Sequence, residues 1–175
     1  MIAPPLIELE SLSFSYTGSQ SPVLDRINLT LQHQQQLGLI GPNGCGKTTL
    51  FHCIMGLLKP QSGSIRFKGN EISEVEDFFA LRKEIGMLFQ DADDQLFSPT
   101  VIEDVAFGPL NLGARPKAAL EVAHKTLTDL GLDHLGDRVT HHLSGGEKKL
   151  VSLATILSMQ PRALFLDEPT NNLDP

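Results

Sequence analysis

The sequence has no tryptophan, one tyrosine and two cysteines in its 175 residues. The cysteines, Cys45 and Cys53, lie too close together to suggest a disulfide framework, which argues against a small disulfide-bonded secreted protein. The first five residues carry no basic stretch followed by an apolar core, so we expect no signal peptide. No run approaches the roughly 20 apolar residues that cross a bilayer. We therefore expect a soluble, cytoplasmic chain that reaches a membrane only through a partner.

Basic residues are also scarce. Lysine and arginine total 14 against 21 aspartate and glutamate residues, and the net charge is -7. No basic stripe is available to neutralise a phosphate backbone, so we expect no nucleic-acid partner. The length suits one domain with a sizeable core and is short for two.

A glycine-rich loop at residues 41–48 fits the pattern G-x-x-x-x-G-K-[ST]. Residues 36–40 predict a short buried strand before it, and residues 48–55 predict a helix after it. In this setting backbone N–H groups cradle phosphates, Lys47 reaches the β and γ phosphates and the Thr48 hydroxyl binds Mg²⁺. A flexible strand-to-helix turn is the alternative interpretation. The predicted nucleotide-binding residues here are Gly41, Pro42, Asn43, Gly44, Cys45, Gly46, Lys47, Thr48 and Thr49.

Two further motifs follow in order. Residues 143–147 read Leu-Ser-Gly-Gly-Glu, and the apolar run 163–166 ends in Asp167 and Glu168. Loop, glycine-rich helix start and carboxylates together predict ATP hydrolysis. These carboxylates could instead cap the element that follows the strand.

The remaining patterns predict an α/β fold. Alternating residues favour strands at 6–10, 12–16, 27–31 and 64–67, and residues 85–89 form a buried strand candidate. Helices are expected at residues 101–106 and 116–130 and from Ser144 onward. The predicted architecture is a P-loop NTPase core with an N-terminal antiparallel β region and an inserted helical subdomain, residues 91–160, within one domain. The expected buried helix faces are Leu120, Ala123, Leu127 and Leu130, and Leu150, Leu153, Ala154 and Leu157.

The motifs resemble those of ATP-binding subunits of ABC transporters over essentially the whole chain. The discriminating element is the segment 143–147, which most other phosphate-loop ATPases lack. Residues 89–97 and 103–109 are similar to the ATPases of energy-coupling-factor importers, which import cobalt, nickel or vitamins. The resemblance implies a subunit that binds ATP and Mg²⁺ and hydrolyses ATP to energise such import. The alternative is a nucleotide-binding or docking module without hydrolysis; an ABC-type ATPase acting on DNA is poorly supported by the acidic composition.

The resemblance implies further roles for single residues. Tyr16 would stack on adenine, or would be an ordinary strand-end aromatic. Asp167 would orient Mg²⁺ through water, and Glu168 would polarise the attacking water as general base. Gln90 would contact Mg²⁺ and the attacking water, or would be a plain surface residue. The signature residues would contact ATP held by the opposite subunit, although Ser144 and Glu147 also fit a capping box. Most family members have glutamine at Glu147. The signature set is Leu143, Ser144, Gly145, Gly146 and Glu147, and the metal set is Thr48, Gln90 and Asp167.

The implied partners are a second ATP-binding subunit, as a homodimer or heterodimer, and integral membrane transporter subunits that dock near residues 90–108. The protein would lie peripherally at the cytoplasmic face of the membrane. Residues 170–174 match the loop that communicates between the two ATP sites, with Asn172 where members have a small residue.

Family members continue beyond residue 175 with further core strands and a histidine that contacts the γ-phosphate. We therefore expect a domain that is incomplete at its C-terminus, either a fragment or a truncated product, with apolar surface exposed beside the loop strand. His141 and His142 are interpreted as a solvated loop in preference to a metal site. Cys45, at a helix N-terminus, is predicted to be reactive and protected by bound ATP.

Overall fold

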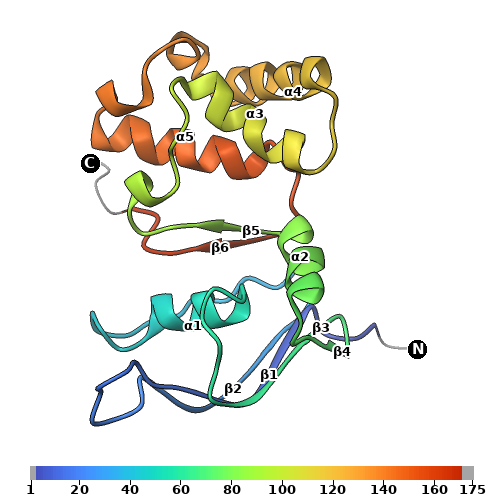
Figure 1. The fold of residues 1–175 in the computed structure, drawn as a ribbon, viewed down its shortest axis with the longest axis vertical. Helices are drawn as coiled ribbons and strands as arrows, with labels where there is room; N and C mark the ends of the chain where they lie inside the picture. Colours follow the sequence, from blue (N-terminus) through green and yellow to red (C-terminus); the bar gives the residue numbers. More distant parts are fainter. Residues whose placement is uncertain (1–2, 171–175) are drawn as a thin grey trace. The chain divides into compact units, whose positions relative to one another are not determined.

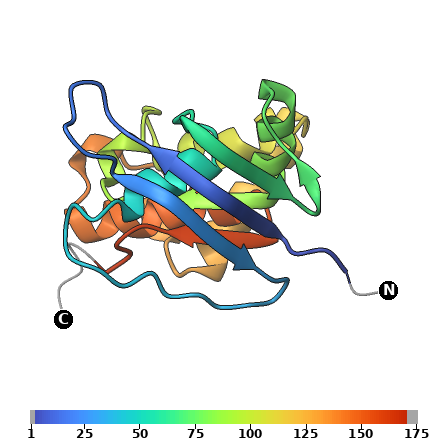
Figure 2. The same ribbon diagram turned by 90° about the horizontal axis from the view of Figure 1, so that it is seen from below.

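The alternating residues near the N-terminus form an antiparallel sheet in the computed structural model, which describes residues 3–170. Its strands are β1 (Ile7–Phe14), β2 (Leu24–Leu31), β3 (Ser62–Phe67) and β4 (Asn70–Glu71), in the order β2-β1-β3-β4. Figure 2 shows the long strands side by side. This sheet belongs to the first of two units, which meet in the sequence between Arg82 and Lys83.

Strand β1 corrects the prediction of separate strands at 6–10 and 12–16. The chain runs as one strand whose register against both neighbours shifts after Leu9 and Glu10. Ser11 has a left-handed φ of 50° at this point. A bulge residue shifts the alternation by one position, so that Ile7 and Leu9 before it and Leu12 and Phe14 after it are all buried.

Helix α1 (Lys47–Ile54) follows the glycine-rich loop, as predicted within one residue at each end. The strand predicted at residues 36–40 is wrong. Among the described residues no strand pairs with this run, and the Ile40 side chain is 100% exposed. An apolar run becomes a strand only when a neighbour accepts and donates its backbone hydrogen bonds, so composition alone does not produce one.

Helix α2 (Val75–Glu84) was not predicted from the sequence. Val75, Phe78 and Phe79 have the spacing i, i+3 and i+4, but Leu81 is the only buried residue of this helix among those described. Its start is stabilised locally, because the Asp77 carboxylate accepts hydrogen bonds from the backbone N–H groups of Ser73 and Glu74.

The second unit combines a two-stranded parallel sheet with helices (Figure 1). Strands β5 (Ile85–Leu88) and β6 (Ala163–Leu166) pair in register from Ile85↔Ala163 to Leu88↔Leu166. The helices are α3 (Val101–Asn111), α4 (Pro116–Asp129) and α5 (Gly145–Leu157), with short 3₁₀ helices η1 (Ala92–Asp94), η2 (Asp133–Leu135) and η3 (Thr140–His142). The predicted helices are confirmed, and the bounds of the subdomain at residues 91–160 stay a prediction.

The buried faces of α4 and α5 differ from those predicted. Leu120, Leu130 and Leu150 are exposed, and Ala119 is buried in α4, whereas Ala123 and Leu127 are buried as predicted. In α5 the buried residues are Lys149, Val151, Ser152, Ala154 and Ile156. Helix α5 packs against α3 and α4 and also against β5, so its buried surface is wider than one leucine stripe and includes polar side chains.

Gly86 in β5 determines how closely α5 approaches the sheet. A Cβ atom at this position would lie 2.1 Å from Ile156 Cγ2 and 3.2 Å from Leu164 Cδ2. Ile156 is itself buried and cannot move into solvent. Only glycine therefore allows this contact between α5 and β5.

We expect Gly86→Ala to lower the free energy of unfolding by about 1–3 kcal/mol, because overpacking outweighs the gain of about 0.5–1 kcal/mol from replacing a strand glycine. Urea denaturation followed by circular dichroism measures the change. Gly38→Ala is the matched control, since a Cβ atom there would meet no heavy atom within 4 Å. Equal stability of Gly86→Ala and the wild type would contradict the close approach.

Candidate functional site

The glycine-rich loop adopts a conformation that other residues do not reach easily. Gly44 and Gly46 have φ values of 79° and 100°. A Cβ atom on Gly46 would lie 3.1 Å from the Val23 carbonyl oxygen, and one on Gly41 would lie 2.7 Å from Cys45 Sγ. Residues 41–45 are exposed. The loop is therefore a preformed backbone turn open to a ligand, which agrees with the phosphate-binding prediction.

Lys47 is the first residue of α1 and folds back over the loop. Its Nζ atom donates hydrogen bonds to the carbonyl oxygens of Gly41, at 3.0 Å, and Pro42, at 3.2 Å. The first turn of α1 contains no acidic residue, and Gly46 supplies no side-chain cap. A cation and helix N-terminal N–H groups thus lie at the same loop, an arrangement that favours an anion. Thr48 follows as the second residue of the helix.

Tyr16 lies beside this helix, within the same unit. Its hydroxyl is 3.2 Å from Thr49 Oγ1, and its ring meets the Phe14 ring edge-to-face at 4.9 Å. The side chain remains 46% exposed. Two contacts therefore hold a partly exposed aromatic ring near the glycine loop, where the sequence prediction requires one.

Parallel pairing of β5 and β6 brings the other predicted residues together in the second unit. Gln90 follows β5, Asp167 and Glu168 follow β6, and both strands end at the same edge. The Asp167 N–H donates to the Leu88 carbonyl at 3.1 Å, which extends the pairing, and the Asp167 side chain is buried. Glu168 has a left-handed φ of 43°. Strained backbone of this kind is concentrated at functional sites.

Sequence reasoning missed Lys149. Its ammonium is buried and donates to the carbonyl oxygens of Phe89 and Gln90, each at 3.0 Å. Burial lowers the pKa of Lys149, while the charges of Asp167, Asp91 and Glu168 oppose that shift. A lysine two residues beyond the signature would ordinarily be assigned to a solvated helix face, so no sequence signal identified it.

The signature residues form a capping box at the start of α5. Glu147 N–H donates to Ser144 Oγ at 3.3 Å, and Ser144 N–H donates to Glu147 Oε2 at 2.7 Å. The Ser144 hydrogen bonds and the Arg138 guanidinium, 2.8 Å from Glu147 Oε1, lower the pKa of Glu147. Leu143 is buried and Gly145 is exposed. The capping function is confirmed, and it leaves the exposed glycine available for a further role.

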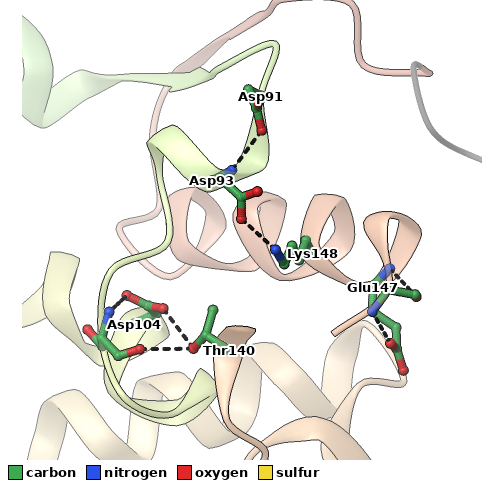
Figure 3. Close-up of polar contacts among 8 residues, drawn as sticks. Asp91, Asp93, Asp104, Thr140, Glu147 and Lys148 are labelled. Carbon is green, nitrogen blue, oxygen red and sulfur yellow. Dashed lines mark hydrogen bonds and ion pairs between the residues drawn. The ribbon is translucent and has the colours of Figure 1, made fainter. Parts of the chain in front are cut away.

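Two groups of polar contacts connect the segment after β5 to the signature region (Figure 3). Asp93 in η1 forms an ion pair with Lys148 of α5 at 2.5 Å. The buried Asp104 carboxylate accepts from the N–H groups of Phe97 and Ser98, at 3.2 and 2.8 Å. The Thr140 hydroxyl lies 3.2 Å from Asp104 Oδ2 and 3.0 Å from the Ser98 carbonyl. These bonds hold residues 97–98 against the segment that leads into the signature.

The candidate residues therefore form two groups, one in each unit, which we call the first and the second half-site. Tyr16 and the glycine loop belong to the first unit, and Gln90, the signature, Asp167 and Glu168 belong to the second. His141 and His142 are exposed, and within residues 3–170 no three histidine, cysteine, aspartate or glutamate side chains converge on a metal position. Of the predicted communication loop, residues 171–174 lie outside the described residues. No described helix has the length and apolar character needed to span a membrane.

Comparison with known proteins identifies the family. The ABC transporter family model matches residues 24–171. A Nitratidesulfovibrio vulgaris protein with the provisional name ABC transporter ATP-binding protein is 57% identical over 171 residues, which cover 98% of this chain and 63% of the relative. The energy-coupling factor transporter ATP-binding protein EcfA of Methanoculleus marisnigri is 46% identical, and the match covers 97% of this chain and 61% of that protein.

Solved structures agree with this assignment. The structure of cbiO1 from Clostridium perfringens, described as part of the ABC transporter complex cbiONQ, superimposes with a TM-score of 0.82 at 39% identity, covering 98% of this chain and 68% of that one. A dimeric ATP-binding cassette bound to ADP and Pi gives a TM-score of 0.85 at 24% identity, covering 96% and 76%, and supports the fold alone. The predicted α/β class and the predicted resemblance are confirmed, and the chain belongs to the ABC transporter family of ATP-binding proteins.

Proposed function

We propose that this chain binds ATP with Mg²⁺ and hydrolyses it as an ATP-binding subunit that energises import through a membrane transporter. The observation that carries the proposal is the parallel pairing of β5 with β6, which places Gln90 and the carboxylates of Asp167 and Glu168 at one strand edge. In open parallel sheets, ligands bind outside the carboxyl ends of the strands. The chain spans 63% of the length of the Nitratidesulfovibrio vulgaris relative, and hydrolysis is proposed for the subunit as a whole.

Nucleotide binding would begin at the first half-site. The exposed Tyr16 ring offers a planar face to adenine, while its Thr49 and Phe14 contacts limit its rotation. Loop N–H groups between Gly41 and Gly46 would bind phosphate oxygens. Lys47, now bonded to two loop carbonyls, would exchange these neutral acceptors for a phosphate of higher charge.

Hydrolysis would use the second half-site. Glu168 would accept a proton from the attacking water, and its left-handed backbone sets where the carboxylate projects. Gln90 and Asp167 are the Mg²⁺ ligands proposed here, and Thr48 is the one proposed in the first half-site; Mg²⁺ needs only one or two protein carboxylates besides phosphate oxygens and waters. When bound, Mg²⁺ would neutralise the charge that develops on the phosphate oxygens.

The signature supports a dimer with shared sites. Gly145 is exposed at the first turn of α5, where glycine costs up to about 1 kcal/mol of helix stability, and the capping box explains only Ser144 and Glu147. Close approach to a phosphate of a second subunit gives a reason for both glycines. We propose a head-to-tail dimer, either of identical or of homologous subunits.

The helical segment offers a surface for an integral membrane subunit. The Phe97 and Phe107 rings meet edge-to-face at 4.6 Å and are 61% and 42% exposed. Leu110 and Leu112 are also exposed on and after α3. An aromatic pair held rigidly at the surface is typical of protein interfaces. The proposed transported species is cobalt, nickel or a vitamin, supported by the cbiO1 and EcfA relatives, and the proposed location is the cytoplasmic membrane face.

One observation favours the alternative of a nucleotide-binding or docking module without hydrolysis. The run at residues 36–40, directly before the glycine loop, forms no strand with any described residue, and Ile40 is fully exposed. A loop that is attached to an unpaired segment is held less rigidly than one attached to a sheet strand, and hydrolysis requires precise positioning.

Steady-state Mg-ATP hydrolysis by the purified chain, with Glu168→Gln as the blank, separates the two candidates. We expect turnover that falls by a factor of about 10² or more in the variant, since a general base contributes roughly 10²–10⁴. Circular dichroism confirms that both proteins are folded. A folded wild type that binds ATP without Glu168-dependent turnover would favour the docking module.

Thiol labelling tests nucleotide binding without hydrolysis. Cys45 is exposed in the loop, whereas Cys53 is buried and its pKa is raised to about 11 by burial. Because the thiolate is the reactive form, we expect alkylation at pH 8 to modify Cys45 alone and to block ATP binding. Saturating ATP should protect Cys45, and Cys53 serves as the internal control for unfolding. Undiminished Cys45 labelling in saturating ATP would contradict the loop assignment.

Charge reversal tests docking in the assembled transporter. Asp93 is paired with Lys148, so its reversal would also break an internal contact. Asp94→Lys is therefore the cleaner probe, and we expect it to reduce substrate uptake in membrane vesicles while ATP affinity stays within about twofold, because long-range charge complementarity acts mainly on association. Glu121→Lys, an exposed reversal on α4, is the control. Normal uptake by Asp94→Lys would reject a docking role for this residue.

A further inference from the structure

Lys149 is a buried cation at the proposed catalytic edge. The residue is 4% exposed, although lysine is almost never fully buried unless it is paired. Its ammonium group donates hydrogen bonds to the carbonyl oxygens of Phe89 and Gln90, at the point where the chain leaves β5. Hydrogen bonds to two neutral carbonyl oxygens offset only part of the free-energy cost of removing an ammonium group from water.

Carboxylate charges offset part of the cost of burying Lys149. Burial lowers the pKa of Lys149, and the charges of Asp167, Asp91 and Glu168 oppose this shift. The buried Asp167 follows β6 and its N–H donates to the Leu88 carbonyl at the end of β5, where Lys149 bonds the carbonyls of the next two residues. Opposite charges in a poorly solvated setting favour the charged form of each partner.

Gln95 adds a second connection between the same segments. Its side-chain oxygen accepts from the Phe89 N–H at 3.3 Å, and its nitrogen donates to the Ser152 carbonyl at 2.8 Å and to Thr155 Oγ1 at 2.9 Å. Phe89 is thus held through both its N–H and its carbonyl group, and both connections lead to α5. The same helix begins with the signature capping box at Ser144.

We propose that Lys149 is a positioning residue for ATP hydrolysis, holding the Phe89–Gln90 backbone at the end of β5 in one arrangement with the signature helix. This inference rests on the proposed ATPase function. Lys149 acts through the Gln90 backbone and need not touch the nucleotide. Because it extends from α5, a displacement of the signature helix would displace the Gln90 backbone with it.

The adjacent lysine provides a matched control. Lys148 lies on the same helix, and its ammonium bonds to the exposed Asp93 carboxylate. This ion pair ends on Asp93 and not on the carbonyls of Phe89 and Gln90, so its loss should leave the bonds at the catalytic edge in place. Lys149→Met and Lys148→Met therefore remove the same chemical group at neighbouring positions with different expected consequences.

The experiment compares Lys149→Met, Lys149→Gln, Lys149→Arg and Lys148→Met with the wild-type chain. We expect Lys149→Met to reduce kcat by about 10–100-fold, since small misplacements of catalytic groups have effects up to that size, with KM and the Kd for a non-hydrolysable ATP analogue within about twofold. Lys149→Arg should recover most of the turnover, because it keeps a charged donor, and Lys149→Gln should recover little. Lys148→Met should match the wild type.

Several results would overturn the proposal. Wild-type kcat in Lys149→Met, or a parallel loss in Lys149→Arg and Lys148→Met, would show that the ammonium position is immaterial. A fall in the folded fraction that accounts for the whole loss of kcat in both Lys149→Met and Lys149→Gln would assign Lys149 a structural role only. Thermal unfolding of each variant measures this fraction.

Amide hydrogen exchange separates failure of this inference from failure of the ATPase proposal. We expect faster exchange at residues 89–91 in Lys149→Met, with protection within α5 retained, and no such change there in Lys148→Met, whose ion pair is to Asp93. If the wild type shows no Glu168-dependent turnover, the ATPase proposal fails, and the exchange result still decides whether Lys149 positions the Gln90 segment. Unchanged exchange at residues 89–91 in Lys149→Met would reject the inference in either case.

Discussion

The parallel pairing of β5 with β6 is the constraint on which the second half-site depends. It aligns Leu88 with Leu166, so the residues that follow the two strands are neighbours although more than seventy positions separate them in the sequence. Once this register is established, Gln90 and the carboxylates of Asp167 and Glu168 follow neighbouring strand ends. Gly86 then permits α5 to approach β5, and that approach brings the Lys149 ammonium to the same edge.

Hydrogen bonds between segments that are distant in the sequence offset the free-energy cost of burying polar side chains. Asp104 on α3 is satisfied by the Phe97 and Ser98 N–H groups and by Thr140, which precedes the signature. Lys149 is satisfied by carbonyls after β5. Because a buried polar group without partners costs about 1–3 kcal/mol, these bonds specify one arrangement of the helices more strictly than apolar packing would. The segment from Gln90 to Thr100 is consequently attached to α5 and to η3, the elements on either side of the signature.

Local stability and proposed chemistry are combined in the same residues. Ser144 and Glu147 cap α5, so an explanation based on helix capping is correct for them, yet it does not account for Gly145 and Gly146. Tyr16 similarly packs on Phe14 and contacts Thr49 while keeping an exposed ring face. A side chain that is already held by contacts within its own element loses less conformational entropy when a ligand binds.

The sequence by itself determined the features that depend on a few adjacent residues. The glycine loop and the start of α1 follow from positions where only glycine reaches the required φ values, and the start of α5 follows from the Ser144–Glu147 capping box. Tertiary structure decided the rest. Residues 36–40 are apolar enough for a strand, but a strand also requires a partner, and none of the described residues supplies one. Lys149 gives no local signal, because its burial and its bonds depend on the distant end of β5 meeting α5, which neither the helix period nor residue type encodes.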